Sequence, residues 1–192
     1  MLRPKDNNLS RKMELKYNEI QEIPNDGNEY FPVIDESGNV LGFEKRNNCH
    51  NGSMILHVVV HLQVFNSKGE IYLQKRSMKK DIQPGKWDTA VGGHVDYGET
   101  IDQALEREAR EEIGIDISKC RDLKYHFSYI HESDVEREMV NTFSAIYDDI
   151  ITPDKDEVTE GRFWSLESVK ENIGKEVFTP NFENEFKMLS LL

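Results

Sequence analysis

The alternation of apolar and polar positions divides the first half of the chain into short strands. Two apolar runs, 30–35 and 40–43, flank the turn residues Glu-Ser-Gly-Asn and predict a hairpin. The run LHVVVHLQVF at 56–65 is almost continuously apolar and rich in β-branched residues, which predicts a central strand. A turn at 66–69 predicts that residues 70–75 pair back as the arm of a second hairpin.

The second half of the chain combines strands with helices. Residues 100–113 contain neither Pro nor Gly and are rich in Ala, Leu, Glu and Arg, so they predict a helix that Gly114 ends. A C-terminal helix is predicted to begin at Pro180. The remaining predictions are strands at 89–91, 124–130, 139–147 and 162–165, a helix start at 165–169, and loops at 47–53, 78–88 and 154–160. Together these elements predict an α/β fold, an α/β/α sandwich with a mixed sheet.

Length and charge bound the domain organisation and the partners. The 192 residues suit a single domain at 29–192 after a polar N-terminal lead at 1–28. The formal net charge of −12 argues against a nucleic-acid polymer as the main partner. The two cysteines make no disulfide framework, and no apolar run is of signal-peptide or membrane-spanning type, so we expect a cytoplasmic protein without a membrane partner. The sequence leaves the oligomeric state open.

The helix predicted at 100–113 carries the most informative candidate chemistry. Glu108, Glu111 and Glu112 stand at positions i, i+3 and i+4, so they share one helix face within roughly 100° of arc. Three carboxylates placed there repel one another, and a hard divalent cation would stabilise them. The preceding glycine-rich segment, VGGHVDYGE, allows the backbone to come close to a ligand. A solvated acidic surface is the alternative interpretation of the same helix face.

The run from Gly93 to Ile115 resembles the signature of the Nudix hydrolase superfamily at every fixed position. That signature reads G-x5-E-x7-R-E-U-x-E-E-x-G-U, where U is aliphatic, and Ala109 and Ile115 fill its aliphatic positions. The resemblance implies a Nudix-type α/β/α sandwich and a metal-dependent hydrolase that cleaves a phosphoanhydride bond in a small molecule containing a diphosphate. It implies that Mg²⁺ or Mn²⁺ is bound by Glu108, Glu111 and Glu112, together with the backbone carbonyl of Gly93.

Such ions would neutralise phosphate charge and lower the pKa of a bound water. Arg107 is expected to orient the carboxylates through a charge-assisted pair with Glu99. By family analogy a glutamate is the general base, and the candidates are Glu111, Glu112, Glu157 and Glu160. The candidates for phosphate contact are Lys75, Arg76 and Lys86, although most lysines and arginines are simply solvated. Trp87 is a candidate for stacking on a base, although a role in the core is commoner.

A second set of residues resembles the type I isopentenyl diphosphate isomerase branch of the same superfamily. His50 and His57 stand seven residues apart, ahead of the segment PGKWDTAVGGHV at 84–95. The resemblance implies a second site, for zinc or manganese, built from His50, His57, His94, Glu136 and Glu138. The alternative is that the histidines are ordinary strand and loop residues and that the two glutamates belong to the polar stretch HESDVERE.

Gly92 departs from the isomerase pattern, which has a cysteine there for proton transfer to and from the allylic carbon. Isomerisation at an unactivated carbon needs an acid and a base within reach of that carbon. With one of the pair missing, hydrolysis is favoured, while an isomerase and a catalytically silent diphosphate-binding domain remain as alternatives. Nucleoside triphosphates, nucleotide sugars, dinucleoside polyphosphates and prenyl diphosphates all carry the diphosphate that the motif addresses, so the sequence does not identify the substrate.

Overall fold

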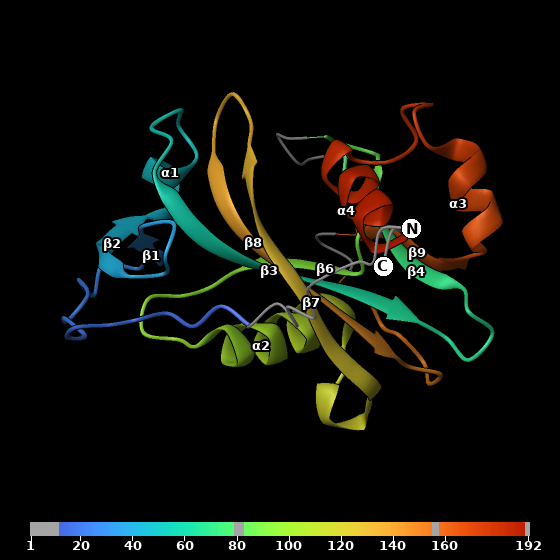
Figure 1. Ribbon diagram of the computed structural model, residues 1–192, viewed down its shortest axis with the longest axis horizontal. Coiled ribbons are helices and arrows are strands. Elements are labelled where there is room, and N and C mark those ends of the chain that lie inside the picture. Colours follow the sequence, from blue (N-terminus) through green and yellow to red (C-terminus); the bar gives the residue numbers. More distant parts are fainter. Residues whose placement is uncertain (1–11, 79–82, 155–157, 191–192) are drawn as a thin grey trace, which may run out of the picture.

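The computed structural model describes residues 12–78, 83–154 and 158–190. At its centre lies a seven-stranded mixed sheet in the order β5-β4-β3-β8-β7, with β6 paired to β3 and β9 paired to β4 (Figure 1). Strands β3 and β8 run parallel, and the other pairs are antiparallel. The strands are β3 (Leu56–Phe65), β4 (Ile71–Arg76), β5 (Trp87–Asp88), β6 (Val91–His94), β7 (Arg121–Glu132), β8 (Arg137–Ile146) and β9 (Val158–Trp164).

A second, two-stranded sheet and the helices complete the fold. Strands β1 (Tyr30–Ile34) and β2 (Val40–Lys45) form an antiparallel hairpin beside the main sheet (Figure 1). The helices are α1 (Arg46–Cys49), α2 (Ile101–Ile113), α3 (Leu166–Asn172) and α4 (Pro180–Ser190), with a 3-10 turn at Ile117–Lys119. Within the described ranges, none of the helices combines the length and the apolar character that a membrane crossing requires.

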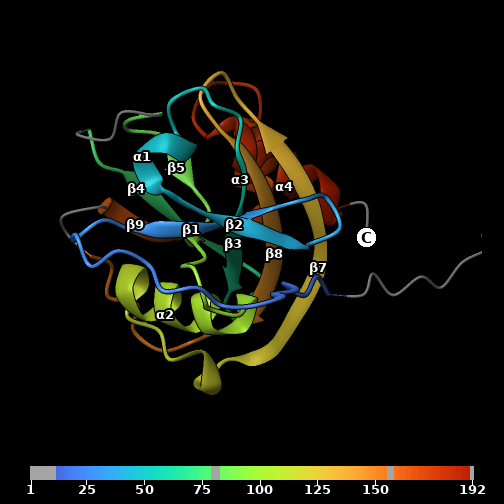
Figure 2. The same ribbon diagram turned by 90° about the vertical axis from the view of Figure 1, so that its left-hand side faces the viewer.

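The central strand β3 separates two different environments, because successive side chains of a strand point to opposite faces of the sheet. Its even-numbered residues, from Val58 to Val64, belong to a hydrophobic core with Ala104 and Leu105 of α2. Its odd-numbered residues include His57 and His61 and face the side on which α4 lies. Figure 2 shows α2 and α4 on opposite sides of the strands, which confirms the predicted sandwich.

Helix α2 is capped at both ends, and its predicted end at Gly114 is confirmed. Thr100 is the N-cap of a capping box, in which its hydroxyl accepts from the backbone of Gln103 and the Gln103 side chain accepts from Thr100 N. Gly114 adopts φ 69°, and Ile115 N donates to Ala109 O over 2.9 Å. The helix therefore has a fixed start and a fixed end, which sets the rotation of its acidic face.

The first predicted hairpin and the central strand are confirmed by β1, β2 and β3. Three loop predictions are wrong in part. The stretch 78–88 ends with strand β5, which pairs with β4. The stretch 154–160 contains the start of β9, because Val158 pairs with Arg76 of β4. The stretch 47–53 contains most of helix α1. Whether a polar segment of this kind forms a strand depends on a partner that is distant in sequence, and local composition does not show it.

The glycine strand lies further along the chain than predicted. It spans Val91–His94 rather than 89–91, because its hydrogen bonds to β3 place Gly92 opposite His61 and Gly93 opposite Val60. Strand β4 meets β3 at only two residue pairs and continues between β5 and β9. The second predicted hairpin is therefore short.

Part of the polar N-terminal lead packs on the domain. Lys16 forms a parallel bridge with Asn39, next to the turn of the β1–β2 hairpin. The Tyr17 hydroxyl accepts a 3.1 Å hydrogen bond from the backbone of Gly98, just ahead of α2. These contacts hold this part of the N-terminal lead beside the N-terminus of the acidic helix α2.

Candidate active site and metal centre

Glycine at position 93 is required by the way α2 packs on β6. A Cβ built on Gly93 would lie 2.0 Å from Cδ of Glu108, far inside van der Waals contact. The Glu108 side chain therefore occupies the space that any other residue at position 93 would fill. Burial raises the pKa of Glu108, and the negative charge of Glu111 adds to this, although the neighbouring Arg107 acts in the opposite direction.

Arg107 links the acidic helix to the loop and strand before it. Its Nε and one terminal nitrogen donate to the two oxygens of Glu99, over 2.9 and 2.8 Å. Its other terminal nitrogen donates to Glu108 over 2.8 Å, and the backbone carbonyl of His94 accepts a further bond of 2.9 Å. Such bidentate, charge-assisted contacts fix geometry as well as charge. Arg107 is therefore placed to orient carboxylates, and its donors are already occupied by protein oxygens.

The two remaining glutamates of the acidic face have different surroundings. Glu112 is buried, and its Oε2 accepts from Gln74 Nε2 over 2.8 Å and from the backbone of Gly92 over 3.2 Å. The side chain of Glu111 is 61% exposed, with Arg107 3.3 Å away. One carboxylate is thus held against the glycine strand, while the other is exposed and accepts a hydrogen bond from Arg107.

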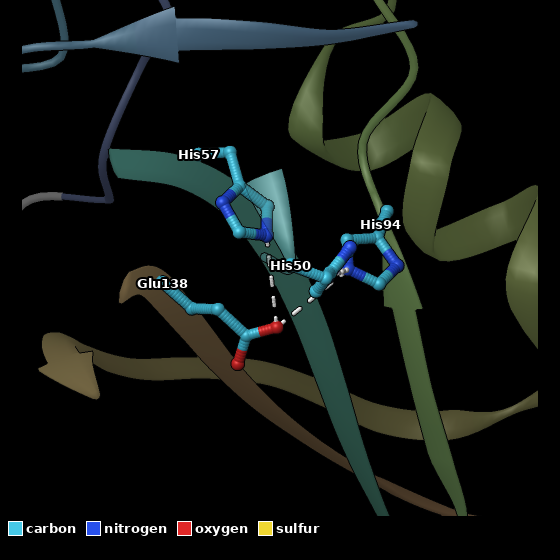
Figure 3. Close-up of side chains that lie close together, drawn as sticks. All are labelled: His50, His57, His94 and Glu138. Atoms are coloured by element: carbon cyan, nitrogen blue, oxygen red, sulfur yellow. Dashed lines mark hydrogen bonds and ion pairs between the residues drawn. The ribbon is translucent and has the colours of Figure 1, made fainter. Parts of the chain in front are cut away.

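Four side chains from four separate segments converge at the C-terminal end of the glycine strand β6. His50 follows α1, His57 belongs to β3, His94 ends β6 and Glu138 belongs to β8, and their potential ligand atoms all lie within 4.8 Å of one another (Figure 3). His50 Nε2 and His94 Nε2 are 3.0 Å apart. Glu138 Oε1 lies 3.8 Å from His57 Nε2 and 3.6 Å from His94 Nε2. We call these four residues the histidine cluster.

Backbone carbonyls orient two of the imidazoles. His50 Nδ1 lies 2.8 Å from Arg46 O, and His57 Nδ1 lies 2.9 Å from Ile55 O. A carbonyl only accepts, so each ring carries its proton on Nδ1 and presents the lone pair of Nε2 to the cluster. The buried Nε2 of His57 has no hydrogen-bond partner among the described residues. A buried nitrogen lone pair without a partner is costly in a folded protein, and a bound cation would satisfy it.

The charge states of the cluster also suit a cation. Burial lowers the pKa of His50 and His57, and lowers that of His94 to about 4, so all three rings are neutral near pH 7. Glu136, whose carboxylate lies 3.5 Å from His50, has a pKa raised to about 7 by burial and by the charge of Glu138. Neutral imidazoles with carboxylates form a ligand set that fits zinc or manganese. All five residues expected for the second site therefore lie together.

The predicted Nudix resemblance is decided by a comparison with known families. The sequence model of the NUDIX domain matches residues 55–182, which is more than half of the chain. The chain belongs to the Nudix family. This range contains the acidic helix and four of the five residues expected for the second site. The fifth, His50, lies just ahead of the range.

Individual relatives include both isomerases and hydrolases. The chain is 32% identical over 159 residues to isopentenyl-diphosphate Delta-isomerase 1 of Photorhabdus laumondii, a match that covers 80% of this chain and 90% of the relative. It is 36% identical over 129 residues to the uncharacterized Nudix hydrolase lmo0368 of Listeria monocytogenes, covering 66% and 74%. The structure of DR0079 from Deinococcus radiodurans has the same fold, with a TM-score of 0.71 and 22% identity over 83% of this chain and 98% of that one.

Gly92 has room for a side chain, unlike the neighbouring Gly93. A Cβ built there would meet His61 Nε2 and Thr89 Cγ2 at 3.5 Å, which is ordinary contact. The absence of a side chain at this position of the Nudix domain is therefore not forced by packing. With glycine there, the position offers no side-chain group that could donate or accept a proton.

The basic candidates lie on and beside strand β4. Arg76 donates to Asp88 over 3.3 Å, and its charge also lowers the pKa of Glu136, so it faces the histidine side. Lys75 is half-buried on β4, and Lys86 is half-buried just before β5. From the same strand, the side-chain amide of Gln74 donates a hydrogen bond to Glu112 of the acidic helix.

The structure also gives the surroundings of Glu160, a general-base candidate, and of Trp87, the stacking candidate. Glu157 lies outside the described residues, and Glu160 lies on β9 with its carboxylate 3.8 Å from Arg162. Trp87 is buried in a small core with Trp164 and Phe178, which agrees with a structural role.

Sequence reasoning missed the residues that support the histidine cluster. Phe31 is buried and stacks on His94 with ring centroids 4.4 Å apart and an interplanar angle of 3°. Arg46 lies 3.3 Å from His94 Nδ1. Neither residue carries a motif, because both act through contacts between segments that are far apart in sequence.

Proposed function

We propose that this Nudix protein is a metal-dependent hydrolase that cleaves a phosphoanhydride bond in a small molecule containing a diphosphate. Glu108, Glu111 and Glu112 would bind Mg²⁺ or Mn²⁺ with the carbonyl of Gly93. The bound ions would neutralise phosphate charge and lower the pKa of the attacking water. Either Glu111 or Glu112 would serve as the base that accepts the proton of that water.

The observation that carries this proposal is the arrangement of the acidic face. One carboxylate packs under Gly93, one is hydrogen-bonded to Gly92 and Gln74, and one is exposed. Arg107 donates its hydrogen bonds to Glu99 and Glu108, so it would position the ligands instead of contacting the substrate. A merely solvated acidic face would need none of these contacts.

We further propose that the histidine cluster, together with Glu136, binds one zinc or manganese ion. Support comes from the unpartnered Nε2 of His57, the neutral rings and the likeness to isopentenyl diphosphate isomerases. His94 belongs to the cluster, and its backbone carbonyl accepts a hydrogen bond from Arg107, so the two metal positions would flank the same short segment of β6. Free thiols at Cys49 and Cys120 are consistent with the cytoplasmic location included in this proposal.

Isomerisation of isopentenyl diphosphate is the second candidate function, and the histidine cluster and the isomerase relatives favour it. Gly92 opposes it, because no side chain there can exchange a proton with a substrate carbon. Relatives of both kinds occur, so substrate chemistry decides between them.

A screen of diphosphate compounds tests the hydrolase proposal. Purified protein is incubated with nucleoside triphosphates, nucleotide sugars, dinucleoside polyphosphates and prenyl diphosphates, in Mg²⁺ and separately in Mn²⁺, and release of phosphate or pyrophosphate is measured. We expect turnover of at least one class, with loss of turnover in EDTA. No turnover of any compound with either metal would contradict the proposal.

A further inference from the structure

A second buried polar cluster lies on the α4 side of the sheet, beyond the candidate metal ligands. Glu185 of α4 is fully buried, and three side chains other than His61 donate to its carboxylate. Gln63 donates over 2.7 Å, Tyr129 over 2.9 Å and Thr142 over 3.3 Å. His61 Nδ1 lies 2.6 Å from the same carboxylate. The acidic and histidine sites do not require this network.

The network fixes the ring of His61 and leaves one nitrogen available. Nδ1 is held by Glu185, while Nε2 has no hydrogen-bond partner among the described residues. The side chain is 10% exposed, so it is nine-tenths buried with one edge open. Burial alone would lower the pKa of His61, but Glu185 outweighs it and raises the pKa to about 9. Nε2 therefore carries a proton near pH 7 and is a donor.

This open nitrogen lies beside the candidate active site. A Cβ on Gly92 would be 3.5 Å from His61 Nε2, and the Gly92 N–H donates to Glu112. Strand β6 pairs with β3 so that Gly92 is opposite His61 and His94 is opposite Val59. Along β3, His61 is therefore two residues, or about 7 Å, from Val59, the residue opposite His94. That separation is comparable to the length of a diphosphate group.

We propose that His61, held by Glu185, contacts the substrate and donates a hydrogen bond from Nε2 to a diphosphate oxygen bound beside Gly92. The inference rests on the proposed hydrolase function and adds a residue to its substrate site. Glu185 acts as a positioning residue, because it touches the ring of His61 and no open surface. An apolar group at the same place would leave the Nε2 proton unpaired, which disfavours a prenyl chain there.

A structural ion pair is the competing explanation, and a binding measurement separates the two. Protein labelled with ¹⁵N is titrated with Mg²⁺ alone and then with methylenediphosphonate, a diphosphate analogue that is not hydrolysed. We expect the Nε2 resonance of His61 to shift with the analogue, while that of His126 on β7, which is bonded to Ser144 of β8, stays unchanged. An unchanged His61 signal in protein that has bound the analogue would overturn the inference.

Variants give the same answer by a second route. We expect H61Q to weaken binding of Mg²⁺–methylenediphosphonate by about 10- to 100-fold, the effect of losing a hydrogen bond from a charged donor. H61Q/E185Q removes both charges and so avoids a buried carboxylate without its partner, and H126Q is the matched control. In the folded double variant, unchanged binding and unchanged KM would overturn the inference while the hydrolase proposal stands. A wild-type protein that neither binds the analogue nor turns over any diphosphate would overturn the hydrolase proposal and this inference with it.

Discussion

The acidic face of α2 and the histidine cluster flank the same glycine strand but are built in opposite ways. The carboxylates of the acidic face come from one helix and have protein donors in Arg107, Gln74 and a backbone amide. The histidine cluster comes from four segments, and its nitrogens face one another, with one buried and unpartnered. The first site is satisfied without a metal and the second is not. If both sites bind metal as proposed, the helix should exchange its ions readily and the cluster should retain its ion.

The largest expected effect concerns the acidic face. Glu112→Gln should preserve folding, because it removes like-charge repulsion, but should reduce kcat by about 1,000-fold or more through loss of a metal ligand. The control is Glu106→Gln on the same helix, where the carboxylate bonds only exposed Arg110. Turnover is measured on the substrate found in the screen, with thermal unfolding alongside. A Glu112→Gln variant with near-normal kcat, or one that melts early, would contradict the account of this face.

A matched pair of glycine substitutions tests the packing of α2 on β6. Gly93→Ala must displace the Glu108 side chain, because its Cβ would lie 2.0 Å from Cδ. We expect a loss of about 100-fold in kcat/KM, the scale that a misplacement of about 1 Å produces. Gly92→Ala has ordinary contacts and should keep most of its fold stability. Wild-type stability and wild-type activity of Gly93→Ala would show that the position of Glu108 is unimportant.

Loss of a histidine should affect metal retention more than turnover in excess Mg²⁺. His57→Asn should reduce the affinity for zinc or manganese by about 10- to 100-fold or more, since one imidazole ligand is removed. His126→Asn, remote from the cluster, is the control. Elemental analysis after dialysis against Mg²⁺ buffer measures the metal that remains. Wild-type protein purified without any retained zinc or manganese would contradict the proposed site.

The smallest expected effect is a pH dependence of stability from the pair of His61 and Glu185. The folded-state pKa of His61 is raised to about 9, above an unfolded value of about 6.5. The stabilisation is therefore complete below about pH 6.5, declines as the unfolded chain alone loses the proton, and is gone above about pH 9. The loss should be at most about 3 kcal/mol. The free energy of unfolding in urea is measured at pH 6 and at pH 9.5, with H61Q/E185Q as the reference that lacks the pair. An equal change of this free energy with pH in the wild type and in the reference would refute the pairing.

How much the sequence reveals follows from the same comparison of sites. The acidic helix and its end at Gly114 were predictable because its composition, its periodicity and its carboxylates lie within one run from Gly93 to Ile115, whereas the capping box at Thr100 was not predicted. The residues of the histidine cluster were found only through a family resemblance. Their support by Phe31 and Arg46 was not predictable, nor was the pairing of His61 with Glu185, 124 positions away. Contacts of this kind are set by strand register and helix docking, which local sequence does not encode.

The most direct test of the central claim, hydrolysis rather than isomerisation, is an NMR assay with isopentenyl diphosphate. The protein, loaded with zinc or manganese and supplied with Mg²⁺, is incubated with this compound, and the proton spectrum is followed for the dimethylallyl isomer. Because Gly92 supplies no group that could exchange a proton with carbon, we predict no isomer at a useful rate. Formation of the isomer at a rate on the order of 1 s⁻¹ would contradict the account.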